Sequence, residues 1–109
     1  MELSEIYEKL KTLGIPVAYL KFDTPQERPF AVYYENGADF DGADNFNLYS
    51  DTGIMVELYF DKKDKKLEHR IEKLFCDVEL SKSPDIYIPE EKIIKIEYTF
   101  DTIQYIQED

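Results

Sequence analysis

The chain has 109 residues, a formal net charge of −11 at pH 7 and a hydrophobic content of 43%. These values are typical of a soluble globular protein, and the length fits one domain spanning residues 1–109. The acidic charge argues against binding of nucleic acid or of an anionic membrane, because binding to phosphate groups relies on Lys and Arg.

The cysteine content and the first residues exclude further classes. Cys76 is the only cysteine, so the sequence holds no internal disulfide and no cysteine-based metal site. Its position directly after Phe75 predicts a small, buried apolar side chain. The chain begins Met-Glu-Leu-Ser-Glu, which does not resemble a secretion signal. No apolar run approaches a length of about 18 residues, which a membrane-spanning helix needs. We therefore expect a soluble protein that is made in the cytoplasm.

The first expected helix covers residues 4–13. Ser4 is expected to cap it, because a serine hydroxyl accepts a hydrogen bond from a free backbone N–H. Gly14 can adopt the left-handed conformation that ends a helix, and Pro16 prevents its continuation. The apolar residues at helical spacing are Leu3, Ile6, Tyr7, Leu10 and Leu13.

Two strands are expected next, at residues 17–22 and 30–35, with a proline-containing loop between them. Residues 36–44 read as an acidic loop, because Asn-Gly is a turn signal and the next clear strand is too far away for a tight hairpin. Residues 45–49 are expected to begin a second arm of the sheet, and residues 51–53 to form a bulge or turn.

A strand followed by a helix organises the middle of the chain. Apolar residues alternate at Ile54, Val56, Leu58 and Phe60, which predicts a strand with one buried face. The spacing then becomes helical, and Asp61 or Asp64 is expected to cap the helix. The apolar stripe of this second helix consists of Leu67, Ile71, Leu74 and Phe75.

The last third of the chain predicts two more strands. Residues 79–84 read as a polar connection, and residues 86–88 as a short strand that Pro89 ends. Residues 93–100 alternate as a strand, which residues 103–106 can continue. The expected order is helix, strand, strand, strand, helix, strand, strand.

This order predicts an α+β fold with a single mixed or mainly antiparallel sheet of about five strands. Two helices cannot cover both faces of such a sheet, so we expect both helices on one face. The other face is then partly exposed to solvent or contacts another subunit.

The sequence suggests no catalytic residue, cofactor or metal site. An EF-hand calcium loop that starts at Asp39 requires Gly at its sixth position and Glu at its twelfth, where this chain has Asp44 and Ser50. A solvated acidic loop is the simpler interpretation, with an irregular cation site as the alternative. His69, between Lys65 and Lys73 at four-residue spacing, reads as a surface residue and not as a general base.

Lysines gather at the start of the second helix, where they oppose the helix dipole. They form either a solvated turn or a docking patch for the acidic loop of a neighbouring copy, and complementary patches of this kind fix the register of head-to-tail rings. The candidate inter-subunit contacts are Lys62, Lys63, Lys65 and Lys66 on one side, and Glu35, Asp39, Asp41 and Asp44 on the other.

Several segments, in this order and spacing, resemble small proteins encoded in the head–tail gene region of long-tailed phages and prophages of Gram-positive bacteria. The similarity runs along nearly the whole chain. The segments are residues 5–11 (Glu-Ile-Tyr-Glu-Lys-Leu-Lys), 14–19 (Gly-Ile-Pro-Val-Ala-Tyr), 29–34 (Pro-Phe-Ala-Val-Tyr-Tyr), 43–45 (Ala-Asp-Asn), 57–59 (Glu-Leu-Tyr), 63–64 (Lys-Asp), 67–68 (Leu-Glu), 87–88 (Tyr-Ile) and 91–92 (Glu-Lys).

The resemblance implies a tail terminator, tail completion or head–tail joining protein without catalytic residues. Such proteins assemble as a hexameric ring on the tail tube, with tail-tube or head-completion proteins as partners, in the host cytoplasm and then in the virion. An anionic ring wall repels the DNA that passes through it, so we expect acidic side chains in the lumen, from residues 35–51.

Two alternatives come from other functional classes. An acidic mimic of nucleic acid would inhibit a host DNA-binding enzyme and would need a continuous, phosphate-like stripe of carboxylates. A small enzyme would need a pocket with perturbed titrating groups.

Overall fold

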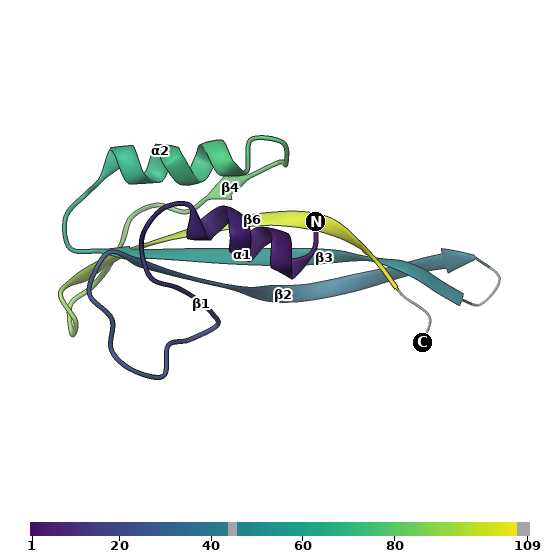
Figure 1. The fold of residues 1–109 in the computed structure, drawn as a ribbon, viewed down its shortest axis with the longest axis horizontal. Helices are drawn as coiled ribbons and strands as arrows, with labels where there is room; N and C mark the ends of the chain where they lie inside the picture. The colour runs from purple at the N-terminus through teal and green to yellow at the C-terminus, as the bar shows by residue number, and fades with distance from the viewer. Residues whose placement is uncertain (44–45, 107–109) are drawn as a thin grey trace.

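The computed structural model describes the backbone of residues 1–43 and 46–106, and the side chains of these residues outside 41–48. Two helices, α1 (Leu3–Lys11) and α2 (Lys65–Leu74), lie against one sheet (Figure 1). The strands are β1 (Val17–Tyr19), β2 (Phe30–Ala43), β3 (Phe46–Phe60), β4 (Ser81–Lys82), β5 (Ile86–Ile88) and β6 (Ile93–Tyr105).

The sheet has six strands in the order β1-β2-β3-β6-β4, and β5 also pairs with β6. The β1–β2 pair is parallel and the other pairs are antiparallel, so the sheet is mixed. The expected α+β fold with one sheet is confirmed. The additional strand is β4, which lies within residues 79–84, the segment expected to be a polar connection. It pairs with Tyr98 and Thr99 of β6.

The core lies between the helices and one face of the sheet. The alternating residues of β3 that were expected to face a core are buried there, from Ile54 to Phe60. They pack with Ile6 and Leu10 of α1 and with Leu67 and Ile71 of α2. Both helices therefore cover the same face of the sheet, as the patterning of strand and helix predicted, and we call the opposite face the helix-free face.

The helix ends are partly as expected. Asp64 caps α2, since its Oδ1 accepts a hydrogen bond from the Leu67 N–H at 3.1 Å. Gly14 has a φ of 76° and follows α1, as predicted. The expected cap at Ser4 is wrong, because α1 begins one residue earlier, at Leu3. Glu2 is its N-cap, and the Glu2 N–H donates to the Glu5 carboxylate at 3.5 Å.

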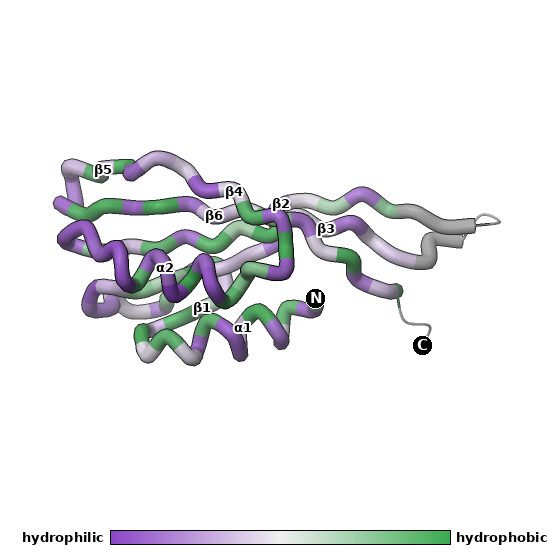
Figure 2. Tube along the Cα trace, turned by 90° about the horizontal axis from the view of Figure 1, so that it is seen from above, coloured by the Kyte–Doolittle hydropathy of each residue, from purple (hydrophilic) through white to green (hydrophobic). Residues whose placement is uncertain are grey.

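Three strands continue well beyond the helices and form an arm, which we define as residues 36–43, 46–53 and 101–105. In Figures 1 and 2 these strands project to the right, away from α1 and α2. The molecule measures 51 × 28 × 25 Å as a result. The acidic loop expected at residues 36–44 is therefore wrong up to Ala43, which is the last residue of β2. Asp44 and Asn45 lie outside the described residues.

Two glycines meet where the arm leaves the body. The β2–β3 register shifts between Glu35 and Ala38, so the irregularity lies in β2 and not at the expected residues 51–53, which are regular β3. Gly37 has a φ of 84°, a conformation that L side chains rarely adopt. A Cβ on Gly53 would lie 2.9 Å from the Asn36 carbonyl oxygen, so this close approach requires glycine.

Cys76 follows α2 and is exposed, which contradicts the expected burial. The core side of the helix ends at Phe75, which is fully buried and contacts Phe100 with ring centroids 5.0 Å apart. Cys76 is the next residue along the chain and points to a different side. The prediction from hydrophobic character alone therefore placed Cys76 in the core wrongly.

We predict that Gly53→Ala destabilises the protein by about 1–3 kcal/mol, because the backbone at Asn36 has to move to admit the methyl group. Equilibrium urea unfolding measures this free energy. A variant as stable as the wild type would show that the contact between Asn36 and Gly53 does not constrain the start of the arm.

Candidate assembly site

The arm exposes large apolar side chains that no helix covers. Phe40 is 61% exposed and Tyr105 is 74% exposed, and Ile103 is also exposed, as is Ile106 directly after the arm. Tyr49 and Tyr105 contact each other edge to face, with ring centroids 6.4 Å apart. Ile103 and Tyr105 lie on the helix-free face and Phe40 on the opposite face, so the arm exposes apolar side chains on both faces, and exposed apolar patches mark interaction sites in soluble proteins.

Three aspartates lie in a row across the helix-free face of the arm. Asp39 on β2 is directly opposite Asp51 on β3. Asp101 on β6 pairs with Gly53 and so lies diagonally from Asp51 on the same face. All three are exposed, and none forms an ion pair with a described residue. Like charges directly opposite each other destabilise a sheet, so this acidic row favours a cationic partner.

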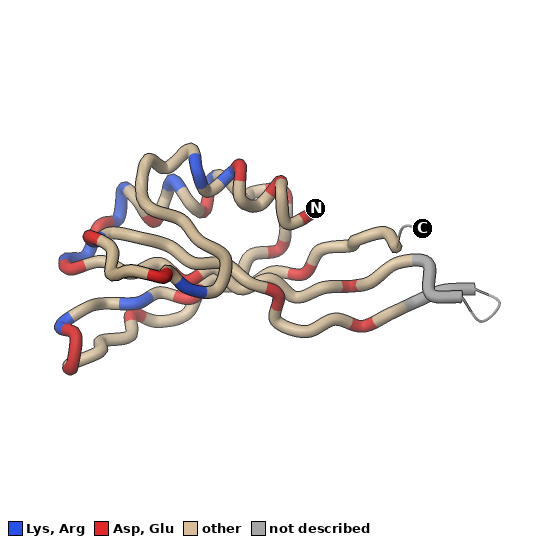
Figure 3. The backbone as a smooth tube through the Cα atoms, turned by 60° about the horizontal axis from the view of Figure 1, so that its bottom comes forward, with Lys and Arg blue, Asp and Glu red and all other residues tan. Residues whose placement is uncertain are grey.

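Positive charge is confined to the other end of the molecule. No Lys or Arg occurs between Arg28 and Lys62, or after Lys95. In Figure 3 the three strands of the arm carry red acidic positions and no blue basic ones, and the blue positions lie on the body. The protein is therefore electrically polar along its long axis.

The four acidic residues proposed as inter-subunit contacts do not form one surface. Glu35 and Asp39 are both exposed, but Glu35 is paired with Ile54 and lies on the helix side, whereas Asp39 lies on the helix-free face. The side chain of Asp41, and Asp44 as a whole, lie outside the described parts of the structure. Asp51 and Asp101 were missed, because their place beside Asp39 depends on the register between distant strands.

The four lysines proposed as inter-subunit contacts also fall into two groups. Lys62, Lys65 and Lys66 are exposed and form no ion pair with a described residue. Lys63 instead bridges two carboxylates of its own chain, with Nζ 2.9 Å from Glu68 Oε1 and 2.8 Å from Asp85 Oδ1. Lys63 is therefore a structural residue, and three of the four remain candidates for contact with a partner.

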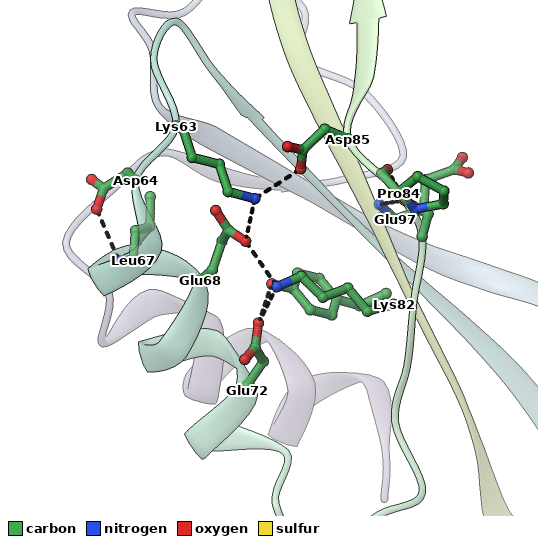
Figure 4. A network of polar contacts seen from close by, with 11 residues as sticks. Lys63, Asp64, Leu67, Glu68, Glu72, Lys82, Pro84, Asp85 and Glu97 are labelled. Carbon is green, nitrogen blue, oxygen red and sulfur yellow. Dashed lines mark hydrogen bonds and ion pairs between the residues drawn. The ribbon is translucent and has the colours of Figure 1, made fainter.

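A polar network fastens α2 to the sheet (Figure 4). The Glu68 side chain is fully buried, and its Oε1 accepts from both Lys63 and Lys82, the latter at 2.8 Å. Its Oε2 has no hydrogen-bond partner among the described residues. Lys82 also pairs with Glu72 at 2.9 Å, and the Tyr98 hydroxyl donates to Glu72 at 2.7 Å. The network joins α2 to β4 and β6.

The titration of this network follows its geometry. Burial acts to raise the pKa of Glu72, but hydrogen bonds from Lys82 and Tyr98 lower that pKa below its usual value. Burial, and then the hydrogen bond to Glu72, raise the pKa of the Tyr98 hydroxyl strongly. Tyr98 therefore donates to Glu72 as a neutral hydroxyl at every physiological pH.

On the body, the helix-free face carries a second polar cluster centred on Glu57. The Tyr34 hydroxyl donates to Glu57 Oε2 at 3.0 Å, and the Tyr59 hydroxyl donates to Oε1 at 2.9 Å. Lys95 Nζ lies 3.7 Å from Glu57. Burial and the Glu57 hydrogen bond raise the pKa of Tyr34 to about 12, so the Tyr34 hydroxyl is protonated and donates to Glu57 at neutral pH.

A groove of about 430 Å³ in the described surface, lined by Phe22, Phe30, Tyr59 and neighbours from residues 20–26, is mainly apolar. His69 is exposed on α2, as expected, and lines none of the hollows described. Among the described residues, no three His, Cys, Asp or Glu side chains converge as metal ligands.

Neither described helix is long and apolar enough to cross a membrane. No protein-family model matches the sequence, and no curated protein matches it either. The resemblance to phage head–tail proteins therefore remains a prediction.

We predict that Lys63→Met with Lys82→Met destabilises the protein by about 3–5 kcal/mol, because the buried Glu68 carboxylate then has no cation beside it. Adding Glu68→Leu should restore much of the loss, since a buried ion cluster replaced by apolar groups is often neutral. Urea unfolding monitored by circular dichroism measures both free energies.

The matched control is Lys65→Met with Lys66→Met, which removes two exposed lysines and should change stability by less than about 0.5 kcal/mol. Equal effects of the two double variants would contradict a specific role for the network around Glu68.

Proposed function

We propose that the protein is a structural subunit of a long-tailed phage or prophage virion, either a tail terminator, a tail completion protein or a head–tail joining protein. It assembles with copies of itself as a ring on the tail tube, and its role is assembly, not catalysis. The resemblance of residues 5–11, 14–19 and 29–34 to such proteins supports the virion assignment, and the α+β fold with one sheet agrees with it.

The observation that carries the proposal is the arm. Three long strands project beyond the helices, and they expose Phe40 and Tyr105 on opposite faces of the sheet. Strand edges and apolar side chains that a protein leaves open are sites for pairing with another chain. An arm that its own chain does not cover is best explained as an element that is covered on assembly.

The charge of the arm fits a ring through which DNA passes. Because no Lys or Arg occurs between Arg28 and Lys62 or after Lys95, the carboxylates of the arm give it a negative potential as a whole. A negative wall repels phosphate, so DNA would pass along it without binding. We propose that acidic side chains of residues 35–51 that do not take part in contacts between copies line or approach the lumen. The other partners are tail-tube or head-completion proteins, in the host cytoplasm during assembly and then in the virion.

The acidic row also supports a second candidate, a nucleic-acid mimic that inhibits a host DNA-binding enzyme. Ile103 and Tyr105 lie on the same face and interrupt the row, which weakens a phosphate-like stripe. Salt-dependent inhibition of a nuclease by the monomeric protein would favour this candidate over the ring.

Electron microscopy of particles that lack the protein tests the proposed function. Overlong tails would identify a tail terminator, and separate heads with finished tails would identify a joining protein. Complementation with Phe40→Ser and Tyr105→Ser should fail, because the arm loses two aromatic contacts that are each worth about 1.5–3 kcal/mol when buried.

The control for this complementation is Tyr87→Ser, which removes an aromatic side chain that is 60% exposed in β5, outside the arm. This variant should restore normal particles. Normal particles without the protein would contradict the proposed function, and normal particles with the arm variant would contradict the role of the arm.

A further inference from the structure

The outer face of α2 is a continuous basic stripe. Its members repeat at intervals of three or four residues, which places them on one side of the helix. The opposite side of α2 buries Leu67, Glu68 and Ile71 against the sheet. With Lys62 just before the helix, the stripe consists of Lys62, Lys65, Lys66, His69, Arg70 and Lys73, all of which are exposed.

The stripe is largely unneutralised within the chain. In the described structure Arg70 donates a hydrogen bond from Nη2 to the Thr12 carbonyl at 3.2 Å, and His69 interacts electrostatically with Glu72. The nearby acids are already engaged, since Asp61 pairs with Arg28 at 2.7 Å and Asp64 caps α2. Lysines one turn apart repel each other, and those at a helix start oppose its dipole. This stripe in a protein of net charge −11 therefore favours an acidic partner.

The acidic row of the arm is opposite in charge to this stripe and similar to it in length. Asp39, Asp51 and Asp101 span about 12 Å, from one direct and one diagonal cross-strand spacing. The helical part of the stripe, from Lys65 to Lys73, spans about 12 Å, at about 1.5 Å per helical residue. The methylene stems of the lysines can also cover Ile103 and Tyr105 beside the row.

The row cannot reach the stripe of its own molecule. The acidic row lies on the helix-free face of the sheet, whereas α2 covers the opposite face. The arm also projects away from the helices (Figure 1). A contact between row and stripe therefore joins two copies.

We propose that the outer face of α2 receives the helix-free face of the arm of a second copy. This inference rests on the proposed function, since it names the surface that the arm contacts in the ring. Because the two surfaces differ, the contact is heterologous and repeats head to tail, which closes a ring when the rotation between copies allows it.

Charge exchange between two variants tests this contact. The stripe variant carries Lys65→Glu, Lys66→Glu and Lys73→Glu, and the arm variant carries Asp39→Lys, Asp51→Lys and Asp101→Lys. Each variant alone should associate at least tenfold more weakly than the wild type in sedimentation velocity, because like charges then face each other at every contact. An equimolar mixture should associate again, because each arm then meets a stripe of opposite charge.

The matched control, Lys11→Glu with Lys21→Glu and Lys92→Glu, makes the same change in net charge at exposed lysines outside the stripe and should associate as the wild type does. A neutral variant, Lys65→Gln with Lys66→Gln and Lys73→Gln, should also associate more weakly than the wild type, and circular dichroism confirms folding. If the wild type associates but the equimolar mixture of the two variants does not, the inference about this contact is overturned and the proposed self-assembly is not. A wild type that stays monomeric at every concentration and salt would overturn both the inference and the proposed self-assembly.

Discussion

The length of the helices relative to the strands determines this structure. α1 has 9 residues and α2 has 10, whereas β2, β3 and β6 have 14, 15 and 13. A helix rises about 1.5 Å per residue and a strand about 3.3 Å, so the strands are roughly three times as long as the helices. Two short helices side by side can bury only one end of such a sheet, and the rest becomes the arm.

The side chains of β3 show where the cover ends. From Phe60 to Ile54 the residues that face the helices are apolar, and the next two on that face are Thr52 and Ser50. Their hydroxyls lie 2.8 Å apart, and Thr102 across the sheet accepts from the Met1 ammonium at 2.6 Å. All three hydroxyl residues are buried and hydrogen-bonded, so polar side chains replace the apolar core at this point and the strand continues beyond it.

Local patterns predicted the body of the fold and part of the arm, since strand was expected at residues 45–49 and 103–106 but not at residues 36–43. The alternation from Ile54 to Phe60 and the stripe at Leu67 and Ile71 identified a sheet covered by helices, because each is a short-range signal. Asn36-Gly37 and the following aspartates disfavour a strand locally, yet pairing with β3 keeps residues 36–43 extended. Pairing with the next strand along the chain, and not the local sequence preference, decided that segment.

The candidate site was also predicted only in part, because local patterns identify some of its residues and contacts between distant residues bring the others together. Helical spacing is local, so the exposed Lys62, Lys65 and Lys66 could be identified from sequence. The bond of Lys63 to Asp85 joins residues 22 positions apart, and the row of Asp39, Asp51 and Asp101 joins three strands. Neither has a signal in the sequence without the register of the sheet. Charge polarity along the molecule is therefore a property of the fold more than of the composition.

Hydrogen exchange of the arm tests most directly that the arm is left open for assembly. In dilute protein, the backbone amides of residues 36–40 should exchange much faster than those of Ile54 and Val56, because the arm has no second layer. In the assembled protein their exchange should slow by at least tenfold, while the core amides stay the same. Amides that are equally protected before and after assembly would contradict the account.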